Sequence, residues 1–503
     1  MPQIRRTEVP GWIDPADAFE ALYAGAENTI WLDAGAGATE GFSYLAAASV
    51  RSRLLTASVS SGTVTVSRPL DPDDDAVETP GSLLDWLRAD LTEQEPAEVP
   101  VPAAAAPDPA STDAVADTGG FQLGWVGWLG YELTGPTDVA AGPSAPSRPP
   151  DAELLLVDRA IAFNHAARTV TLICRALPHT TAESAVETEL AAWAQQTTEA
   201  LQAARQHPAP EPSPHTDAAT PVDVHWRHSS TAYARLIEQC QARINAGDAY
   251  QLCLTNEVTV SGRFDPLEVY RRLRATSPSH HGGLLIFGDR ALLSASPEQF
   301  LAVSTDGLVR TRPIKGTRPR SLDPATDDRL RAELLASDKE RAENLMIVDL
   351  MRNDLGRVAM LGTVAVTALL AVESYPHVHQ LVSTVEARLA PGLTGLDALE
   401  ACFPAGSMTG APKRSAMGIL RGLEGGERGV YAGAFGYLGL DGTMDLAMVI
   451  RSIVLGPAGA SIGTGGGITA LSNADEEIEE TQVKARALIH ALIPGGHEAH
   501  AGV

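Results

Sequence analysis

Lysine is scarce in this sequence, although basic residues in general are not. Among the 38 lysine and arginine residues of the 503-residue chain, lysine occurs only at Lys315, Lys339, Lys413 and Lys484. An amine can lose its proton and act as a nucleophile or a base, whereas a guanidinium stays charged and can only bind. Lys315 lies in the arginine-rich segment 310–320. The segment alone leaves open whether Lys315 is a nucleophile or one more anion-binding cation.

Positive charge is also in short supply over the whole chain. The formal net charge is −25 at pH 7. Proteins that bind nucleic acid without a special motif neutralise its phosphates with a basic surface, so this balance argues against a general nucleic-acid binder. A local basic cluster such as 310–320 suits a small anionic ligand better than a polymer.

Cysteines are few, and long apolar runs are missing. The four cysteines are scattered, and their positions show neither paired nor metal-binding spacing. No run approaches the roughly 20 apolar residues of a membrane span, and residues 1–10 are not followed by the apolar core of a signal peptide. We therefore expect a cytoplasmic protein in a reducing compartment that contacts no membrane.

The composition changes along the chain and suggests two regions. Residues 1–206 mix strand-like and helix-like patterns, and residues 207–224 are rich in proline and polar side chains. From there to residue 495 apolar periodicity is dense. We predict an N-terminal region at 1–206, a linker at 207–224 and a second, catalytic region at 225–495.

The predicted last helix, residues 474–492, carries two carboxylates at the edge of its apolar stripe. At 100° per residue, Glu477, Glu480 and Lys484 share one face, and Asn473 is placed to cap the helix. A glycine run delivers the chain to this helix, and its free backbone N–H groups could bind a carboxylate. The alternative is a solvated helix face with a Glu480–Lys484 ion pair.

Another acidic residue lies within a predicted long helix, residues 327–352. Glu343 stands where an exposed face gives way to the apolar residues that follow it. Mg²⁺ takes one or two protein carboxylates, keeps several waters and completes its shell with an anionic substrate. Glu343, Glu477 and Glu480 would meet this need if the fold brings the two helices together.

Two further residues have both a structural and a functional interpretation. Arg451 lies in the apolar run 448–455, which predicts a buried strand, and a buried guanidinium needs an anionic partner. That partner could be a structural carboxylate or the carboxylate of a substrate. His379 could be a core histidine or a site residue.

Several motifs follow one another along the chain. In the second region they are Pro-Ile-Lys-Gly-Thr at 313–317, Glu-Asn-Leu-Met-Ile-Val-Asp-Leu-Met-Arg-Asn-Asp at 343–354, Gly-Ser-Met-Thr-Gly-Ala-Pro-Lys at 406–413, Gly-Ala-Phe-Gly-Tyr at 433–437 and the terminal Glu-x-x-Glu-x-x-x-Lys. Together they resemble the chorismate-utilising enzymes, the family of anthranilate synthase component I, aminodeoxychorismate synthase component I, isochorismate synthase and salicylate synthase. The N-terminal region is similar to the family's companion region, through Trp31-Leu32-Asp33, Phe42-Ser43-Tyr44 and Gly127-Trp128-Leu129-Gly130-Tyr131-Glu132.

The resemblance implies a fold, a cofactor and a set of roles. The fold is α+β, with a two-layered antiparallel β-sandwich core flanked by helices, and the cofactor is Mg²⁺ on Glu343, Glu480 and Glu477. Lys315 becomes the covalent nucleophile, Glu298 the general acid, and His379 a neighbour of the leaving hydroxyl. The substrate, chorismate, would be held by Arg451, Tyr431, Gly465, Gly466, Gly467, Lys413, Lys484, Thr317 and Ser407.

The residue at 315 separates the branches of the family. Anthranilate synthases carry alanine there, whereas aminodeoxychorismate enzymes carry the lysine. Isochorismate and salicylate synthases place a lysine base where this chain has Gln251. The resemblance therefore implies amination of chorismate to 4-amino-4-deoxychorismate, for folate or for an aminated secondary metabolite.

The chain itself has no cysteine placed to release ammonia from glutamine, and other functions stay open. No cysteine lies in the Gly-x-Cys-x-Gly turn of a class I glutaminase, so we expect a separate glutaminase subunit to supply ammonia. Rival products are anthranilate, 2-amino-2-deoxyisochorismate and isochorismate. A phosphate-binding module is a rival from another class, but the sequence lacks the Gly-x-x-x-x-Gly-Lys-Ser/Thr pattern.

Overall fold

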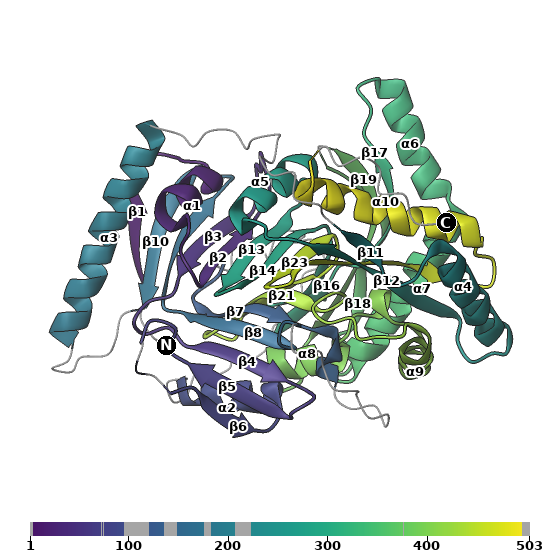
Figure 1. Ribbon diagram of the computed structural model, residues 1–503, viewed down its shortest axis with the longest axis horizontal. Helices are drawn as coiled ribbons and strands as arrows, with labels where there is room; N and C mark the ends of the chain where they lie inside the picture. The colour runs from purple at the N-terminus through teal and green to yellow at the C-terminus, as the bar shows by residue number, and fades with distance from the viewer. Residues whose placement is uncertain are drawn as a thin grey trace.

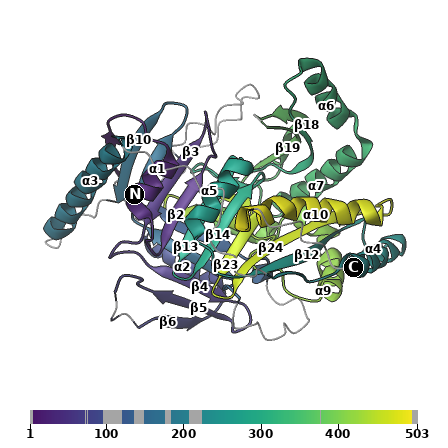
Figure 2. The same cartoon turned by 45° about the horizontal axis from the view of Figure 1, so that its top comes forward.

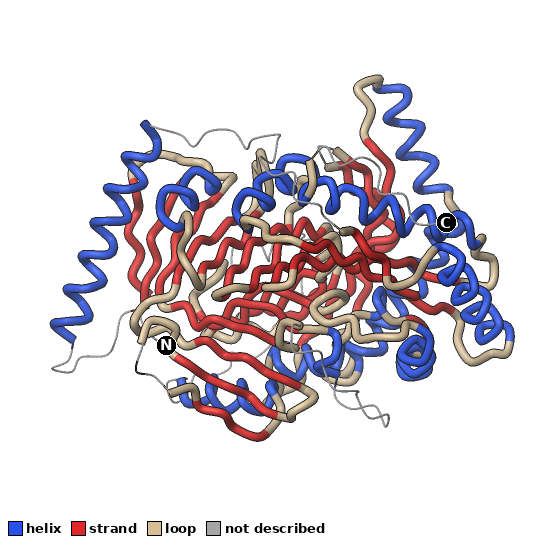
Figure 3. Tube along the Cα trace, in the orientation of Figure 1, coloured by secondary structure: helices blue, strands red, loops and turns tan. Residues whose placement is uncertain are grey.

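Two twelve-stranded antiparallel sheets, named A and B here, form the centre of the structure, and the helices surround them (Figure 3). This confirms the predicted α+β fold with a two-layered antiparallel core. The computed structural model describes residues 4–71, 73, 75–94, 120–134, 148–175, 183–206, 223–375 and 377–494. Within these residues no helix is long and apolar enough to cross a membrane.

Sheet A crosses the molecule from the N-terminal strand to the strand that follows the predicted linker (Figure 1). One short strand, β20 (Gly410–Ala411), pairs with β12 outside the main order. In spatial order the strands are β1 (Ile4–Val9), β10 (Thr169–Arg175), β9 (Arg159–Asn164), β3 (Phe42–Ala47), β2 (Thr29–Asp33), β13 (His281–Phe287), β14 (Arg290–Ser296), β23 (Ser452–Gly456), β24 (Gly459–Ile468), β12 (Gln251–Ser261) and β11 (Val224–Trp226).

Sheet B contains the strand that bears Lys315 at one end of its order. Strand β18 (Ala365–Ser374) pairs with β19 outside the main order. In spatial order the strands are β17 (Ile314–Pro319), β19 (Val378–Arg388), β16 (Leu308–Thr311), β15 (Gln299–Val303), β22 (Met444–Met448), β21 (Ala434–Gly439), β7 (Gly124–Leu129), β8 (Ala152–Val157), β4 (Leu54–Ser58), β5 (Thr63–Ser67) and β6 (Val77–Pro80).

The helices lie on the outer faces of the two sheets. In Figure 1 the last helix, α10, runs across the strands of sheet A, and α8 lies near β4. The helices are α1 (Pro15–Tyr23), α2 (Leu83–Gln94), η1 (Tyr131–Thr134), α3 (Glu183–Gln206), α4 (Ser230–Asn245), α5 (Pro266–Thr276), α6 (Pro324–Ala336), α7 (Asp338–Gly356), α8 (Gly395–Cys402), η2 (Gly406–Met408), α9 (Lys413–Leu423) and α10 (Ala474–Leu492).

Apolar side chains fill three layers of this arrangement. Between the sheets, Trp128 of β7 meets Phe287 of β13, with ring centroids 5.0 Å apart. Leu488 of α10 belongs to the layer between sheet A and its helices, and Ile347 of α7 to the layer beneath sheet B. Strand β7 is buried on both faces, which explains why its sequence is almost continuously apolar.

Both predicted regions contribute strands to both sheets. Strand β2 pairs with β13 through Trp31 and Leu284, and β7 pairs with β21 through Trp128 and Phe435. The second predicted region therefore shares its sheets with the N-terminal region. The predicted linker at 207–224 lies almost entirely outside the described residues, so the domain boundary stays a prediction.

The predicted long helix at 327–352 is wrong in one respect. The structure has two helices there, α6 and α7, separated by Ser337. Ser337 has φ −69° and ψ 110°, an extended conformation that ends one helix and precedes the next. The predicted helix at 474–492 is confirmed as α10, and the side chain of Asn473 accepts hydrogen bonds from the N–H groups of Asp475 and Glu476.

Candidate active site

Lys315 lies in a bulge of strand β17. Ile314 pairs with Val382 of β19 and Thr317 with Gln380, so Lys315 and Gly316 together oppose one residue of β19. A bulge re-aims the side chains it contains. Gly316 has φ +87°, a conformation that favours glycine, and a Cβ there would lie 2.8 Å from a methyl group of Leu334.

The arginines around Lys315 are already paired with carboxylates. Lys315 itself makes no hydrogen bond or ion pair with any described residue. The basic segment is therefore mostly neutralised by the protein, and the amine is the cation left for a ligand. The pairs are Arg310 with Glu386 (2.6 Å), Arg312 with Glu373 (2.5 Å), Arg318 with Glu340 (2.7 Å) and Arg320 with Asp327 (3.0 Å).

Glu298 lies between β14 and β15 and is only 7% exposed. Burial raises the pKa of its carboxyl to about 7, against the opposing effects of the Lys315 ammonium, the Ser407 hydroxyl and the Ile314 amide. The Oγ atom of Ser407 is buried and has no hydrogen bond of ordinary geometry among the described residues. A carboxyl that titrates near neutral pH can donate or accept a proton, and it faces an amine and an unpaired hydroxyl.

The three predicted metal ligands lie on α7 and α10, which meet at one end (Figure 2). Glu477 is 3% exposed and accepts a hydrogen bond of 2.8 Å from Ser472 Oγ. Its Oε1 atom is also 3.4 Å from the Nζ atom of Lys339 on α7. One turn further along α10, Glu480 pairs with Lys484 at 2.6 Å.

The charges of these side chains influence one another. Burial raises the pKa of Glu343, and the carboxylates of Glu480 and Glu477 add to the increase. The ammonium groups of Lys315 and Lys339 act in the opposite direction. Burial would also raise the pKa of Glu480, but the neighbouring lysines, first Lys484, lower it overall. The fold thus brings Lys315 and the three glutamates together.

The donor chemistry of this cluster fits Mg²⁺, which prefers carboxylate oxygens. In the structure as described, no group of three or more His, Cys, Asp or Glu side chains is arranged to hold a metal ion. Mg²⁺ needs only one or two protein carboxylates, with water and substrate oxygens supplying the rest. The carboxylates of Glu480 and Glu477 add to the raised pKa of Glu343, so a divalent cation bound among these acids would be stabilised.

Strand β24 has an open edge beside this cluster. Strand β23 pairs with β24 only as far as Ser461, so the glycines beyond have no described strand on that side. Thr255 of β12 and Gly465 of β24 lie opposite each other in the ladder, but both form their hydrogen bonds elsewhere. The Thr255 N–H donates to Glu424, and Gly465 O accepts from Lys484 Nζ at 2.8 Å. Gly465 therefore turns its polar groups to the open edge, and by alternation Gly467 does so too.

The N–H of Gly466 points away from the open edge, and the lack of a side chain at Gly466 lets Glu477 lie close to the backbone. This N–H points toward β12 by the same alternation, and a Cβ at this position would lie 2.8 Å from Glu477 Oε2. Of the three predicted backbone amides, two can reach a ligand at the open edge. Only glycine at 466 leaves the Glu477 carboxylate undisturbed.

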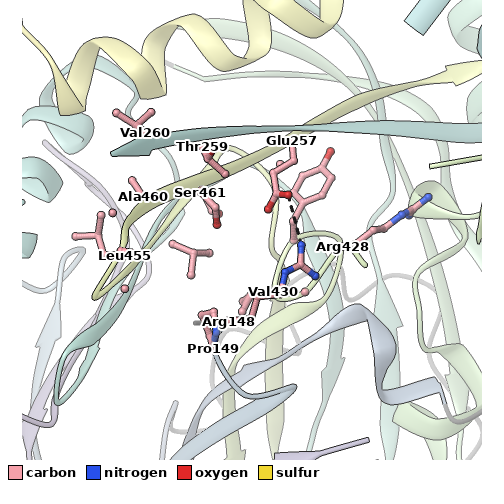
Figure 4. A pocket seen from close by; sticks show the side chains of 18 of the residues that line it. Arg148, Pro149, Glu257, Thr259, Val260, Arg428, Val430, Leu455, Ala460 and Ser461 are labelled. Atoms are coloured by element: carbon pink, nitrogen blue, oxygen red, sulfur yellow. Dashed lines mark hydrogen bonds and ion pairs between the residues drawn. The ribbon is translucent and has the colours of Figure 1, made fainter. Parts of the chain in front are cut away.

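Tyr431 packs against the same strand further along. A Cβ added to Gly463 would lie 1.9 Å from Tyr431 Cγ, so the tyrosine ring rests directly on this glycine. Both residues line a cavity of about 390 Å³ between sheet A and the segments 148–149 and 428–431 (Figure 4). Glu257, Thr259 and Ser461 give this cavity its polar wall. Among the predicted site residues, only Tyr431 lines it.

Arg451 lies in an exposed turn, whereas the sequence predicted a buried strand. It lies in the turn between β22 and β23 with φ +51°, and its side chain is exposed, because the chain passes here from sheet B to sheet A. No described carboxylate pairs with it. The prediction of a buried strand through Arg451 is therefore wrong, but its guanidinium is free to bind an anion.

Of three other predicted site residues, two are held by hydrogen bonds within the protein and one is exposed. His379 is 2% exposed, and its ring nitrogens lie 2.8 Å from Ser374 Oγ and 3.0 Å from Asp327 Oδ1. Lys413 donates to Asp354 at 2.5 Å and to Cys402 O at 2.9 Å. Thr317 is exposed on β17.

Two residues near the cluster carried no predicted role in binding or catalysis. Lys339 contacts Glu477, and its signal in the sequence was its rarity and its spacing of four residues from Glu343. Gln251 is 2% exposed, and its Oε1 atom is buried without a partner among the described residues. Its amide lies over Gly467, where a Cβ would come within 1.9 Å of Nε2.

Comparison with known proteins gives this geometry a context. Residues 73–490 match the family described as chorismate binding enzyme. An aminodeoxychorismate synthase of Streptomyces griseus is 41% identical over 484 residues, 95% of this chain and 63% of that protein. The chain thus spans less than two thirds of that relative's length. Anthranilate synthase component 1 of Streptomyces coelicolor is 42% identical over 387 residues, 74% of this chain and 73% of that protein.

A solved structure has the same fold over its whole length. The crystal structure of anthranilate synthase component I from Streptococcus pneumoniae TIGR4 is similar with a TM-score of 0.69 at 28% identity. The match covers 96% of this chain and 99% of that one. Both halves of the present chain, including the N-terminal strands of both sheets, are therefore part of one shared architecture.

Proposed function

This chain belongs to the family of chorismate binding enzymes, and from that premise we propose that it converts chorismate and ammonia to 4-amino-4-deoxychorismate. One observation carries the proposal. Lys315 is presented by a bulge, is left unpaired while the arginines around it are paired, and acts on a carboxyl, Glu298, whose pKa is about 7. A nucleophile and a general acid thus lie beside each other.

In the first step the neutral amine of Lys315 attacks ring carbon C2. The new C2–N bond forms, the ring double bonds shift toward C4 and the C4–O bond breaks, while Glu298 gives its proton to the departing hydroxyl, which leaves as water. The nitrogen of Lys315 now carries a positive charge, and Glu298 is ionised. Splitting one poor displacement into two easier ones is what a covalent nucleophile offers.

In the second step ammonia attacks C4 and expels the lysine. The C4–N bond forms, the ring double bonds shift back, the C2–N bond breaks, and Lys315 leaves as a neutral amine. The proton lost by the incoming ammonia returns to Glu298. The net change replaces the 4-hydroxyl of chorismate by an amino group and releases one water, so both side chains end as they began.

The remaining site residues would bind and orient the substrate. The exposed Arg451 guanidinium and the N–H groups of Gly465 and Gly467 are free to donate hydrogen bonds to carboxylate oxygens. The Ser407 hydroxyl, buried and unpaired, would hydrogen-bond near Glu298. The other residues predicted to bind chorismate are Gly466, Tyr431, Lys484, Lys413 and Thr317. His379 would lie near the leaving hydroxyl.

Mg²⁺ would be held by Glu343, Glu480 and Glu477. When bound it would supply positive charge to a substrate carboxylate, which the protein's own acids would otherwise repel. Lys484 completes this side of the site, because it joins Glu480 to the backbone of Gly465.

Ammonia would come from a class I glutaminase partner. None of the four cysteines has glycines at the positions of a glutaminase nucleophile turn, and all four are buried. Free ammonium should replace the partner in vitro. The purified chain should release no glutamate from glutamine.

Anthranilate formation is the second candidate function, because an anthranilate synthase component is as similar in sequence as the aminodeoxychorismate synthase. The lysine at 315 favours amination at C4. Incubation of the purified chain with chorismate, Mg²⁺ and ammonium, followed by mass and NMR identification of the product, separates the two. We expect 4-amino-4-deoxychorismate with its enolpyruvyl group intact. Anthranilate with pyruvate, 2-amino-2-deoxyisochorismate or isochorismate would contradict the proposal.

A further inference from the structure

Lys339 lies among the glutamates proposed to bind Mg²⁺. Its Nζ atom is 3.4 Å from Oε1 of the buried Glu477. On α7 it precedes Glu343 by four residues, one helical turn on the same face. Burial acts to lower the pKa of Lys339, but the carboxylates of Glu477, Glu343 and Glu480 together raise it. The ammonium therefore contacts one proposed metal ligand, Glu477, and is influenced by the charges of the other two.

The helix itself does not stabilise a positive charge at the position of Lys339. It is the second residue of α7, where the positive end of the helix dipole disfavours a cation. Arginine is the usual cation of this chain, yet lysine stands here. A guanidinium would clamp a carboxylate through two bonds, whereas an ammonium is a compact point charge on a flexible stem. A lysine therefore suits a position where the positive charge must be able to move away from the carboxylates.

Lys339 is held much less firmly than Lys484, the other lysine of the cluster. Lys484 pairs with Glu480 at 2.6 Å and donates to Gly465 O at 2.8 Å. Lys339 makes the single contact with Glu477, and its side chain is 54% exposed. It can therefore turn into solvent without breaking any other described contact.

We propose that Lys339 is an internal competitor of the divalent cation. Its ammonium neutralises the glutamates in the metal-free protein and moves into solvent when Mg²⁺ binds. Lys339 thereby gives the buried Glu477 a counter-charge beside the Glu480–Lys484 pair in the metal-free protein, and the affinity for the cation is lower as a result. The inference rests on the proposed metal site, but it does not depend on which product the enzyme forms.

Binding of Mn²⁺ to the full chain without substrate, followed by electron paramagnetic resonance, tests the competition directly. Lys339→Met should bind Mn²⁺ about threefold to fivefold more tightly than the parent, a modest change because the ion pair is half exposed. Lys339→Arg keeps the charge and should bind no more tightly than the parent. Arg341→Met is the matched control, since Arg341 lies on the same helix and, among the described residues, donates only to Leu335 O.

The scarcity of lysine allows a second measurement on the parent protein. After reductive ¹³C-methylation, the four lysines and the amino terminus give few NMR signals. The Lys339 signal, assigned by its loss in Lys339→Arg, should move toward that of a free side chain as Mg²⁺ is added. The Lys413 signal should stay in place, because that lysine is held by Asp354.

The outcomes separate the inference from the site on which it rests. Tighter binding by Lys339→Met together with a moving Lys339 signal supports the competition. Equal or weaker binding by Lys339→Met, or a Lys339 signal that ignores Mg²⁺, overturns it while the metal site stands. A parent protein that binds no Mn²⁺ at all overturns the metal site and the inference with it.

Discussion

The Lys315 ammonium acts on the buried carboxyl of Glu298, and it is the largest influence opposing the burial that raises the pKa of Glu298 to about 7. The Glu298 carboxyl therefore exists in both its protonated and its ionised form at neutral pH. Protonated Glu298 can give up its proton without a large barrier, and the same carboxylate can take a proton back when ammonia has added. The predictions on catalysis start from this pair.

The rate should fall as Glu298 loses its proton. The acid form predominates below the pKa of about 7, so for enzyme whose Lys315 is neutral, as the attack requires, kcat/KM for chorismate should fall by about tenfold per pH unit above that pH. Glu298→Gln should lower the rate by about 10²-fold to 10⁴-fold and abolish this decline. The profile must be measured at a constant concentration of free ammonia at each pH, since ammonium itself titrates. A parent profile that is flat between pH 6 and about 8 would exclude Glu298 as the general acid.

Lys315→Ala should stop turnover while leaving the substrate bound. Loss of a covalent nucleophile should slow the reaction at least about a thousandfold, roughly 4 kcal/mol in the barrier. Chorismate binding should stay measurable by calorimetry, because Arg451 and the β24 edge remain. Lys315→Arg is the matched control, since it keeps the positive charge but cannot attack. Substantial turnover by Lys315→Arg with ammonium would show that Lys315 serves only as a binding cation.

Local features of the fold could be predicted from the sequence. The bounds of α10 and its Asn473 cap follow from an apolar stripe and a capping residue that lie within a few turns of each other. The same stripe placed Glu477 and Glu480 at the edge of the buried face. Such features depend only on neighbouring residues, so one sequence contains the information.

Features that depend on distant pairing could not be predicted from residue patterns. The bulge at Lys315 exists because β17 meets β19 in one register, and nothing near Lys315 specifies that register. Arg451 sits in an apolar run that looks like one strand, but the chain leaves sheet B and enters sheet A there. The break at Ser337 lies in a charged stretch without apolar periodicity to mark it. The competition assigned to Lys339 needs α7 and α10 side by side.

Glu480→Gln should weaken the dependence on Mg²⁺. The amide keeps the size of the side chain but removes the charge that would bind the cation, so half-maximal rate should need roughly tenfold more Mg²⁺. A titration of the initial rate with MgCl₂ at saturating chorismate measures this. Glu479→Gln on the exposed side of α10 is the matched control and should titrate as the parent does. An unchanged titration for Glu480→Gln would remove Glu480 from the set of ligands.

Arg428→Met should destabilise the fold more than other charge removals. Arg428 is 5% exposed, donates to Glu424 at 2.7 and 2.9 Å, and reaches Met408 O and Cys253 O. Its guanidinium lies 4.2 Å from the ring centroid of Tyr131 and so ties the N-terminal region to the second region.

Removing the arginine leaves the carboxylate of Glu424, which is 3% exposed, without its counter-charge. The free energy of unfolding should fall by about 3–5 kcal/mol, measured by urea titration followed by circular dichroism. The double variant Arg428→Met with Glu424→Gln should lose less than the single variant, because no buried charge is then left unpaired. Arg352→Met is the control: its pair with Asp349 is exposed, so the loss should stay below about 1 kcal/mol. Equal losses for Arg428→Met and Arg352→Met would mean that the buried pair adds nothing to stability.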